Sequence, residues 1–163
     1  MEVHELKTQT KILPPEILLE EYRELLQEEN VKELPITVTG NSMSPFLVHG
    51  RDTVYLSRLN RPARRGDVLL YRRDNGVYVL HRVFDTTSDG YTMVGDAQTD
   101  LEHGIRQEQI IAVVTRVIRK DKDLRPGTFW WDFFETVWLR LRTFRCPIHK
   151  LYTIIKKVGK ASL

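Results

Sequence analysis

The stretch DVLLYRRDNGVYVLHRVF, residues 67–84, decides the fold of this chain. Two runs rich in valine, leucine and tyrosine flank Asp74-Asn75-Gly76, which is the pattern of two strands joined by a turn. An Asn-Gly pair favours a two-residue type I′ turn, because that turn needs positive φ at both positions. The stretch therefore predicts an antiparallel β-hairpin that turns at Asn75-Gly76.

Similar short runs surround this hairpin from residue 35 to residue 122. Further turn signals occur at Gly66-Asp67 and at Ser88-Asp89-Gly90. The pattern predicts a mainly β, antiparallel domain over residues 35–122, rolled into a partly closed barrel. Its six expected strands are ITVTG (36–40), DTVYLSR (52–58), DVLLYRR (67–73), GVYVLHRVF (76–84), GYTMVGD (90–96) and IIAVVTRVIR (110–119).

The two ends of the chain have helical patterns instead. Residues 1–34 form an N-terminal arm with an amphipathic helix expected over 15–30, which Pro15 can begin. Residues 128–163 are expected to form a basic tail of two short amphipathic helices. The expected apolar faces are Phe133, Val137, Leu141 and Phe144 in the first, and Ile148, Leu151, Ile155 and Val158 in the second.

Composition and charge limit the class of protein. Of the 163 residues, 41% are apolar and 29% are charged, which is typical of a soluble globular protein rather than a disordered or polytopic membrane protein. The net charge is +3, yet seven basic residues and no acidic one lie between Thr136 and Leu163, so the rest of the chain is net negative. This asymmetry argues against a nucleic-acid partner and for a tail that seeks an anionic one.

Two interpretations of the tail are equally consistent with its sequence. Its tryptophans and basic residues suit the plane of an anionic membrane surface. Alternatively, its aromatic residues pack on the β domain or on a second copy of the chain. The sequence has no secretory signal and no apolar run long enough to cross a membrane, so we expect a cytoplasmic protein, peripheral on the inner face of the membrane if the tail binds lipid.

Metal and cofactor sites are not expected. Cys146 is the single cysteine, and no Cys/His cluster has the spacing of a zinc site. The residues that could carry chemistry are Ser42, in TGNSMSPFL (39–47), and His81, which alone of the five histidines lies within an expected strand. On pattern alone, Ser42 reads as a turn residue and His81 as a half-buried strand residue with one hydrogen bond.

The order of four motifs adds a resemblance. GNSMSP, RRGDVLLYR (64–72), VLHRV (79–83) and VGDAQTD (94–100) resemble, one after another, the boxes of the type I signal peptidase family. The match spans about residues 36–118. It is closest to the variant of the endoplasmic reticulum and some Gram-positive bacteria, in which histidine replaces the bacterial lysine base. LexA-like repressor peptidases share the fold and the serine box.

This resemblance implies roles for particular residues. Ser42 would be the nucleophile, His81 its general base, and the backbone amide of Ser42 an oxyanion donor. Asp96 matches the aspartate of the family's GDN box, although alanine stands here in place of the asparagine. Three acidic residues, Asp96, Asp100 and Glu102, compete to orient His81, and we favour Asp100.

The predicted function is therefore a serine endopeptidase that cleaves a leader or precursor peptide. In the family, the substrate binds as an added β-strand with small side chains near the cut. The sequence differs from the family in having no transmembrane segment. The identity of the substrate therefore does not follow from the resemblance. The alternative is a non-catalytic or regulatory membrane-surface protein that keeps the peptidase fold.

Overall fold

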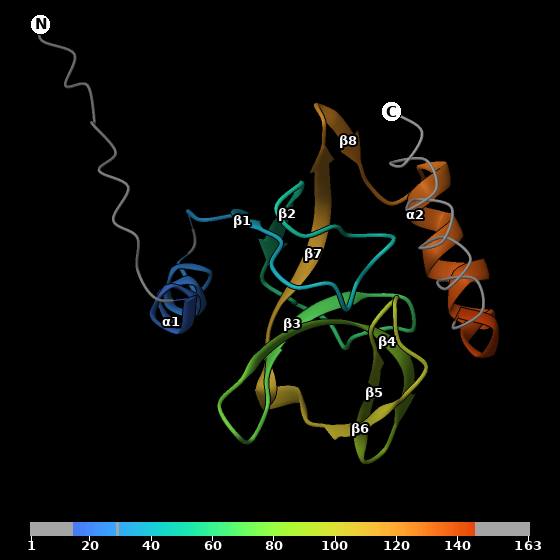
Figure 1. Ribbon diagram of the computed structural model, residues 1–163. Coiled ribbons are helices and arrows are strands. Elements are labelled where there is room, and N and C mark those ends of the chain that lie inside the picture. The colour runs from blue at the N-terminus through green and yellow to red at the C-terminus, as the bar shows by residue number, and fades with distance from the viewer. Residues whose placement is uncertain (1–14, 29, 146–163) are drawn as a thin grey trace, which may run out of the picture.

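A computed structural model describes residues 15–28 and 30–145 (Figure 1). Within these residues, one helix precedes eight strands, and a helical segment follows them. The elements are α1 (Pro15–Leu25), β1 (Leu34–Thr37), β2 (Asp52–Ser57), β3 (Val68–Arg72), β4 (Tyr78–Thr87), β5 (Gly90–Val94), β6 (Glu102–Ile105), the 3₁₀ turn η1 (Gln107–Gln109), β7 (Ile110–Arg119), β8 (Lys122–Leu124), α2 (Phe129–Phe133), the π-helical turn η2 (Phe134–Trp138) and the 3₁₀ turn η3 (Arg142–Phe144).

The strands form one antiparallel sheet. Its order is β1-β2-β7-β3-β4-β5-β6, and β8 pairs with β7. The mainly β, antiparallel prediction is confirmed, but the expected partial closure is wrong, because the sheet remains open in the described part of the chain. In Figure 1 the strands β3 to β6 curve strongly, and β1, β2 and β7 extend away from them. The domain is therefore a twisted and curved open sheet rather than a partly closed barrel.

The hairpin of residues 67–84 forms, with a different turn. Gly76 has φ +86°, but Asn75 is not a positive-φ residue. The amide of Gly76 donates to Arg73 O and the amide of Arg73 donates to Val77 O, both at 2.9 Å. These bonds define a three-residue loop in which the glycine supplies the left-handed position, and so the predicted type I′ turn is wrong.

Each of the six predicted strands has a counterpart, although β1 shares only Ile36 and Thr37 with ITVTG (36–40), and the described residues contain two more strands that were not predicted. β6 has the sequence EHGI and β8 has KDL, so neither shows the apolar alternation of a strand. Lys120 and Asp121, between β7 and β8, have φ of 45° and 63°. These values belong to a two-residue type I′ turn, which here uses no glycine.

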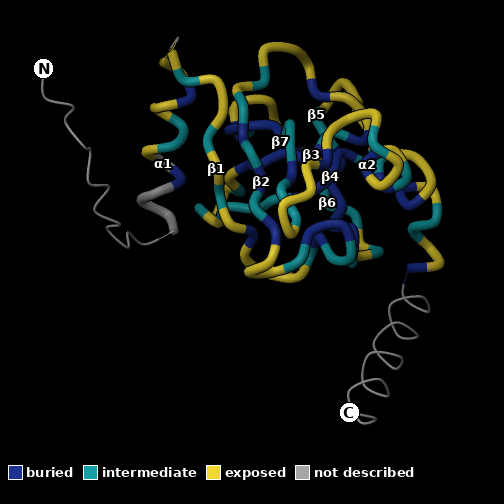
Figure 2. The backbone as a smooth tube through the Cα atoms, turned by 90° about the horizontal axis from the view of Figure 1, so that it is seen from above, coloured by how far each residue is buried: buried dark blue, intermediate teal, exposed yellow. Residues whose placement is uncertain are grey.

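Two apolar clusters stabilise the fold, one on each face of the β3-β4 hairpin. The first cluster contains Leu70 from β3 and extends to Leu19 of α1 and Trp131 of α2. The second contains Leu69 and Tyr71 from β3 and Val83 from β4. Burying both faces explains the continuous apolar run of β3. Figure 2 shows the buried residues concentrated in the central strands, with α1 and α2 on opposite sides.

The described part of the tail packs on the β domain mainly through a face other than the predicted one, although Phe133 of the predicted face also packs against the first cluster. Trp131, Phe134 and Trp138 are buried in the first cluster. By contrast, Val137 and Phe144 of the predicted face are 45% and 60% exposed. Trp131, Phe134 and Trp138 are separated by three and four positions, which also places them on one helix face, and the chain buries this face because it carries the larger aromatic side chains. The second predicted tail helix lies outside the described residues.

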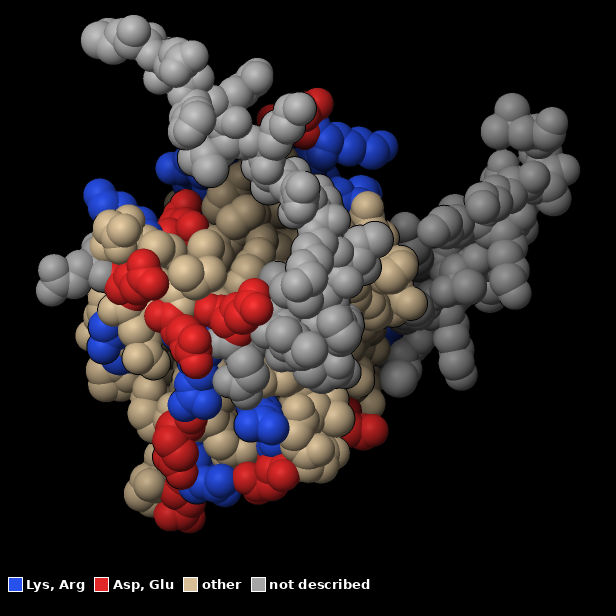
Figure 3. Space-filling model, turned by 90° about the vertical axis from the view of Figure 1, so that its left-hand side faces the viewer, with Lys and Arg blue, Asp and Glu red and all other residues tan. Residues whose placement is uncertain are grey.

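Some of the described basic residues of the tail are buried and others are exposed. Arg145 is fully buried, whereas Arg140 is exposed. On the face drawn in Figure 3, several acidic side chains lie near one another to the left of the centre, and the basic side chains are scattered. That face therefore lacks the basic stripe, among described residues, that nucleic-acid backbones bind. In the described part of the chain, no helix has the length and apolar character needed to span a bilayer.

Candidate active site

Ser42 lies in the turn that joins β1 to β2. Gly40, with φ +80°, opens this turn, and the amide of Ser44 donates to Asn41 O at 3.1 Å. Met43 follows the serine and is buried in the first cluster, so it anchors the turn to the domain. The local apolar residues thus fix a backbone that leaves the Ser42 side chain partly exposed.

His81 is buried in the middle of β4. It pairs with Leu69 across the β3-β4 ladder, and only 4% of its surface is exposed. Its Nδ1 atom lies 3.3 Å from the hydroxyl of Tyr71. Residues 71 and 81 lie on the same face of the two strands because side chains alternate along each of them. The strand pairing therefore sets this contact.

Behind His81, Tyr71 connects to an ion pair. The Tyr71 hydroxyl donates to Glu102 Oε2 at 2.7 Å, and Arg73 donates to both carboxylate oxygens of Glu102 at 2.7 Å and 2.6 Å. Glu102 Oε2 is itself 4.0 Å from His81 Nδ1. The Tyr71 hydroxyl donates its one proton to the Glu102 carboxylate. Its oxygen can therefore accept a hydrogen bond from a proton on His81 Nδ1.

Burial controls the protonation of this group. It lowers the pKa of His81 to about 4, and the nearby negative charge of Glu102 offsets only part of that effect. Burial and the bond to Glu102 raise the pKa of Tyr71 well above its ordinary value. Burial also acts to raise the pKa of Glu102, but hydrogen bonds from Arg73 and Tyr71 outweigh it and the pKa is lowered. At neutral pH the group holds a neutral imidazole, a neutral phenol and a carboxylate.

Ser42 and His81 line one cavity of about 240 Å³. The other lining residues come from the β1-β2 turn, from β3-β4 and from the loop after β5, among them Gly40, Arg73, Leu80 and Gln98. Within the described chain, no hydrogen bond joins the Ser42 hydroxyl to His81. A free enzyme with such a pair commonly tightens this contact only when substrate binds.

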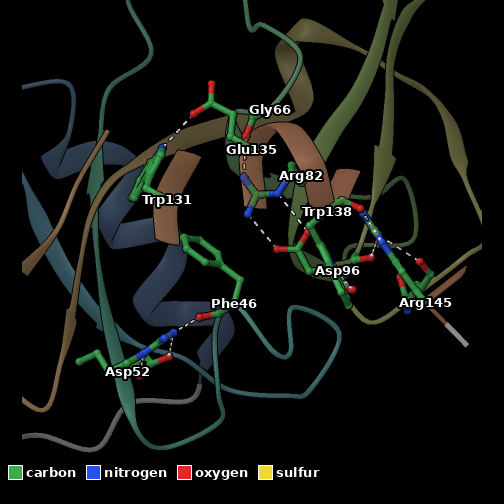
Figure 4. A network of polar contacts seen from close by, with 12 residues as sticks. Phe46, Asp52, Gly66, Arg82, Asp96, Trp131, Glu135, Trp138 and Arg145 are labelled. Atoms are coloured by element: carbon green, nitrogen blue, oxygen red, sulfur yellow. Dashed lines mark hydrogen bonds and ion pairs between the residues drawn. The ribbon is translucent and has the colours of Figure 1, made fainter. Parts of the chain in front are cut away.

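Asp96 serves a different partner. It forms a fully buried, two-bond ion pair with Arg82, at 3.0 Å and 2.8 Å, and Arg82 also donates to Gly66 O at 2.8 Å (Figure 4). Arg82 follows His81 in the strand, so its side chain points to the opposite face of the sheet. The geometry gives Asp96 a structural role on that face.

The position of Asp100 also differs from the prediction. Asp100 is exposed in the loop before β6 and makes no ion pair or hydrogen bond with a described residue. Of the three acidic residues considered, Glu102 is the one beside the imidazole. The reason is the β5-β6 pairing, which sets Glu102 opposite Met93 at the start of a strand. We therefore assign the neighbouring carboxylate to Glu102 in place of Asp100.

The loop after β5 connects the serine turn to the tail. The amide of Ala97 donates to Ser42 O at 2.8 Å. A Cβ atom on Gly95 would lie 2.6 Å from the same oxygen, so only glycine allows this close approach. The backbone of the loop thus fixes the backbone of Ser42.

Three tail residues hold this loop by its carbonyl groups. Trp138 Nε1 donates to Asp96 O at 2.8 Å, Arg142 donates to Thr99 O, and Arg145 Nη1 donates to Gly95 O at 2.9 Å and Gln98 O at 3.1 Å (Figure 4). Burial lowers the pKa of Arg145 to about 10, so it stays charged at neutral pH. Two of the basic tail residues therefore act within the fold.

Sequence reasoning missed Tyr71, Arg73, Arg82 and the buried tail residues. Tyr71 and Arg73 lie in the predicted strand DVLLYRR, and their positions two apart place them on one face. Arg82 lies in the quoted motif VLHRV. The partners of Tyr71, Arg73 and Arg82 are ten or more positions away, so only the strand pairing could reveal them.

The described residues contain no group of three or more His, Cys, Asp or Glu side chains placed to hold a metal ion. No model of a known protein family matches the chain, and no curated protein matches it. The case for a function therefore rests on the motifs and on this geometry.

Proposed function

We propose that this protein is a serine endopeptidase of the signal-peptidase type, with Ser42 as nucleophile and His81 as general base. The observation that carries the proposal is the single cavity lined by both residues, with a buried imidazole that is neutral at physiological pH. A neutral histidine can accept the serine proton, whereas an imidazolium cannot. The motif order GNSMSP, RRGDVLLYR, VLHRV and VGDAQTD supports the same assignment.

The reaction follows the usual two steps of a serine hydrolase. His81 takes the proton of the Ser42 hydroxyl while the oxygen attacks the substrate carbonyl, and the imidazolium then gives that proton to the leaving amine. Water, activated by the same histidine, hydrolyses the acyl-enzyme. The Ser42 amide donates no hydrogen bond to the described residues, and it is available for the oxyanion.

Tyr71 and Glu102 serve as positioning residues in this scheme. The Tyr71 proton goes to Glu102, so the tyrosine oxygen accepts the proton of His81 Nδ1 and leaves the lone pair of Nε2 for Ser42. The charge of Glu102, 4.0 Å away, stabilises the imidazolium that forms during attack. Arg73 holds the carboxylate in place.

The experiment that tests the function is cleavage of a library of extended peptides, with products identified by mass spectrometry. Wild type and Ser42→Ala are purified in parallel, because a contaminating protease would cleave the peptides in both preparations. We expect each accepted peptide to be cut at one bond by the wild type only. A wild type that cuts no peptide, or preparations that cut alike, would contradict the proposal.

Removing the charge behind His81 should slow the reaction. We expect Glu102→Gln to lower kcat/KM by about 10-fold to 100-fold, because the imidazolium loses its stabilising carboxylate. The matched control is Glu108→Gln, which removes an exposed glutamate paired with Arg106 at 2.7 Å. Equal activity of the two variants would exclude a role for Glu102.

The value of kcat/KM should fall only at an unusually low pH. His81 must be neutral to act, and burial lowers its pKa to about 4, so kcat/KM should stay level down to about pH 5 and fall below it. An unfolded histidine titrates near 6.5, so the unfolded chain binds the proton first. The folded state therefore loses about 3 kcal/mol of stability as pH falls from 6.5 to 4. Circular dichroism at each pH separates titration from unfolding, and a limb centred near 6.5 in folded protein would refute the assignment.

A further inference from the structure

A second and larger recess lies away from the Ser42 cavity. Its volume is about 650 Å³, and its walls come from the loop after β2 (residues 58–67), from β7 and from the start of the tail. Part of the wall is apolar, with Leu59, Val113 and Trp131. None of the Ser42 chemistry uses it.

Four arginines from one short segment line this recess: Arg58, Arg61, Arg64 and Arg65. Two carboxylates also line it, Asp67 and Glu135. Four positive and two negative charges in one concave surface leave an excess of positive charge. A recess with such an excess attracts anions.

Both carboxylates are already engaged. Asp67 accepts two bonds from Arg61, at 2.7 Å and 2.9 Å, and one from the amide of Arg64 at 2.7 Å. Glu135 accepts from Trp131 Nε1 at 3.1 Å and lies next to Gly66, as Figure 4 shows. Arg61 therefore neutralises Asp67, whereas Glu135 accepts one bond and leaves one negative charge against the other three arginines.

The remaining guanidinium groups are not neutralised. Arg65 lies over the ring of Phe84 and donates to Phe84 O, which supplies no negative charge. The side chains of Arg58 and Arg64 are exposed and form no ion pair or hydrogen bond with another described residue. Two or three guanidinium groups thus remain for a ligand.

We propose that this recess binds a phosphate-bearing anion. Guanidinium groups bind phosphate oxygens through paired N–H donors, and several of them around one recess suit an anion with many acceptor oxygens. The apolar wall accommodates a ligand with a carbon portion. Phe129 and Trp130, which are 71% and 52% exposed, lie in the same tail segment as the wall residues Pro126 and Trp131. Such aromatic residues suit a membrane interface, so a lipid headgroup and a soluble phosphate ester are the two sources of this chemistry.

The test uses the full chain and two probes. Sedimentation with phosphatidylcholine vesicles, with and without phosphatidylglycerol, measures binding to a lipid source. Calorimetric titration with glycerol phosphate measures binding to a soluble source. The variant Arg58→Gln/Arg64→Gln removes the two unpaired guanidinium groups, and Lys120→Gln/Lys122→Gln removes two exposed charges at the β7-β8 turn as the control.

We expect the arginine variant to lose about 30-fold in binding to phosphatidylglycerol vesicles, since each basic residue near an anionic surface contributes about fivefold. The control should lose much less. A loss confined to glycerol phosphate would also support the site and would identify a soluble ligand. The proposal would be overturned if the wild type bound neither the vesicles nor glycerol phosphate. It would also be overturned if the arginine and lysine variants lost the same amount of binding.

Discussion

Replacing Ser42 with alanine should lower kcat/KM for an accepted peptide by at least about 1000-fold, because it removes the only atom that attacks the carbonyl in the proposed mechanism. Binding of the peptide should change little, since the methyl group leaves the cavity walls intact. The measurement is the rate of product formation at substrate concentrations below KM.

The matched control is Ser44→Ala. Ser44 lies two residues further on in the same turn, and its backbone hydrogen bond to Asn41 O does not depend on the side chain. The described residues that line the cavity include Ser42 but not Ser44. A comparable loss in both variants would show that the turn, rather than the Ser42 hydroxyl, is required.

Breaking the buried Arg82–Asp96 pair should have the largest effect on stability. Both side chains are fully buried, and removal of one partner leaves the other charge without compensation. We expect Arg82→Met or Asp96→Asn to lower the free energy of unfolding by about 3–5 kcal/mol. For a chain of this size, that corresponds to a decrease in Tm of roughly 10 °C.

An exposed pair of similar geometry provides the control. Arg61 binds Asp67 through two bonds, but the Arg61 side chain is 40% exposed. We expect Arg61→Gln to cost less than about 1 kcal/mol. Urea denaturation of the three variants checks both values. A cost for Arg82→Met no larger than that for Arg61→Gln would mean that the buried pair is not a stabilising element.

The sequence predicts the strands well where local patterns dominate. The run IIAVVTRVIR is recognisable because it combines β-branched residues with a strand length, and it forms β7. β6 and β8 are short and polar, and they exist because β5 and β7 offer them edges for pairing. The apolar face of the tail was mispredicted because the sequence has two apolar stripes at helical spacing, one with Phe133 and Val137 and one with Trp131, Phe134 and Trp138, and local spacing does not decide which is buried.

The candidate site shows the same limit. Ser42 and His81 are identified by the order of the four motifs rather than by local pattern, and the structure brings them to one cavity. The neighbouring carboxylate does not stand out, because its identity depends on pairing between β5 and β6. In the chain, Asp96, Asp100 and Glu102 differ by a few positions. In the fold, Asp96 lies with Arg82, Asp100 is exposed and Glu102 reaches Tyr71.

The most direct measurement is the mass of the protein itself during turnover. An accepted peptide prepared as an activated ester acylates a serine peptidase faster than the intermediate hydrolyses, and acid then stops the reaction. The proposed mechanism predicts a wild-type mass increased by the acyl group, with the added mass on the proteolytic fragment that contains Ser42. An adduct on another residue, or full cleavage activity that persists in Ser42→Ala, would contradict it.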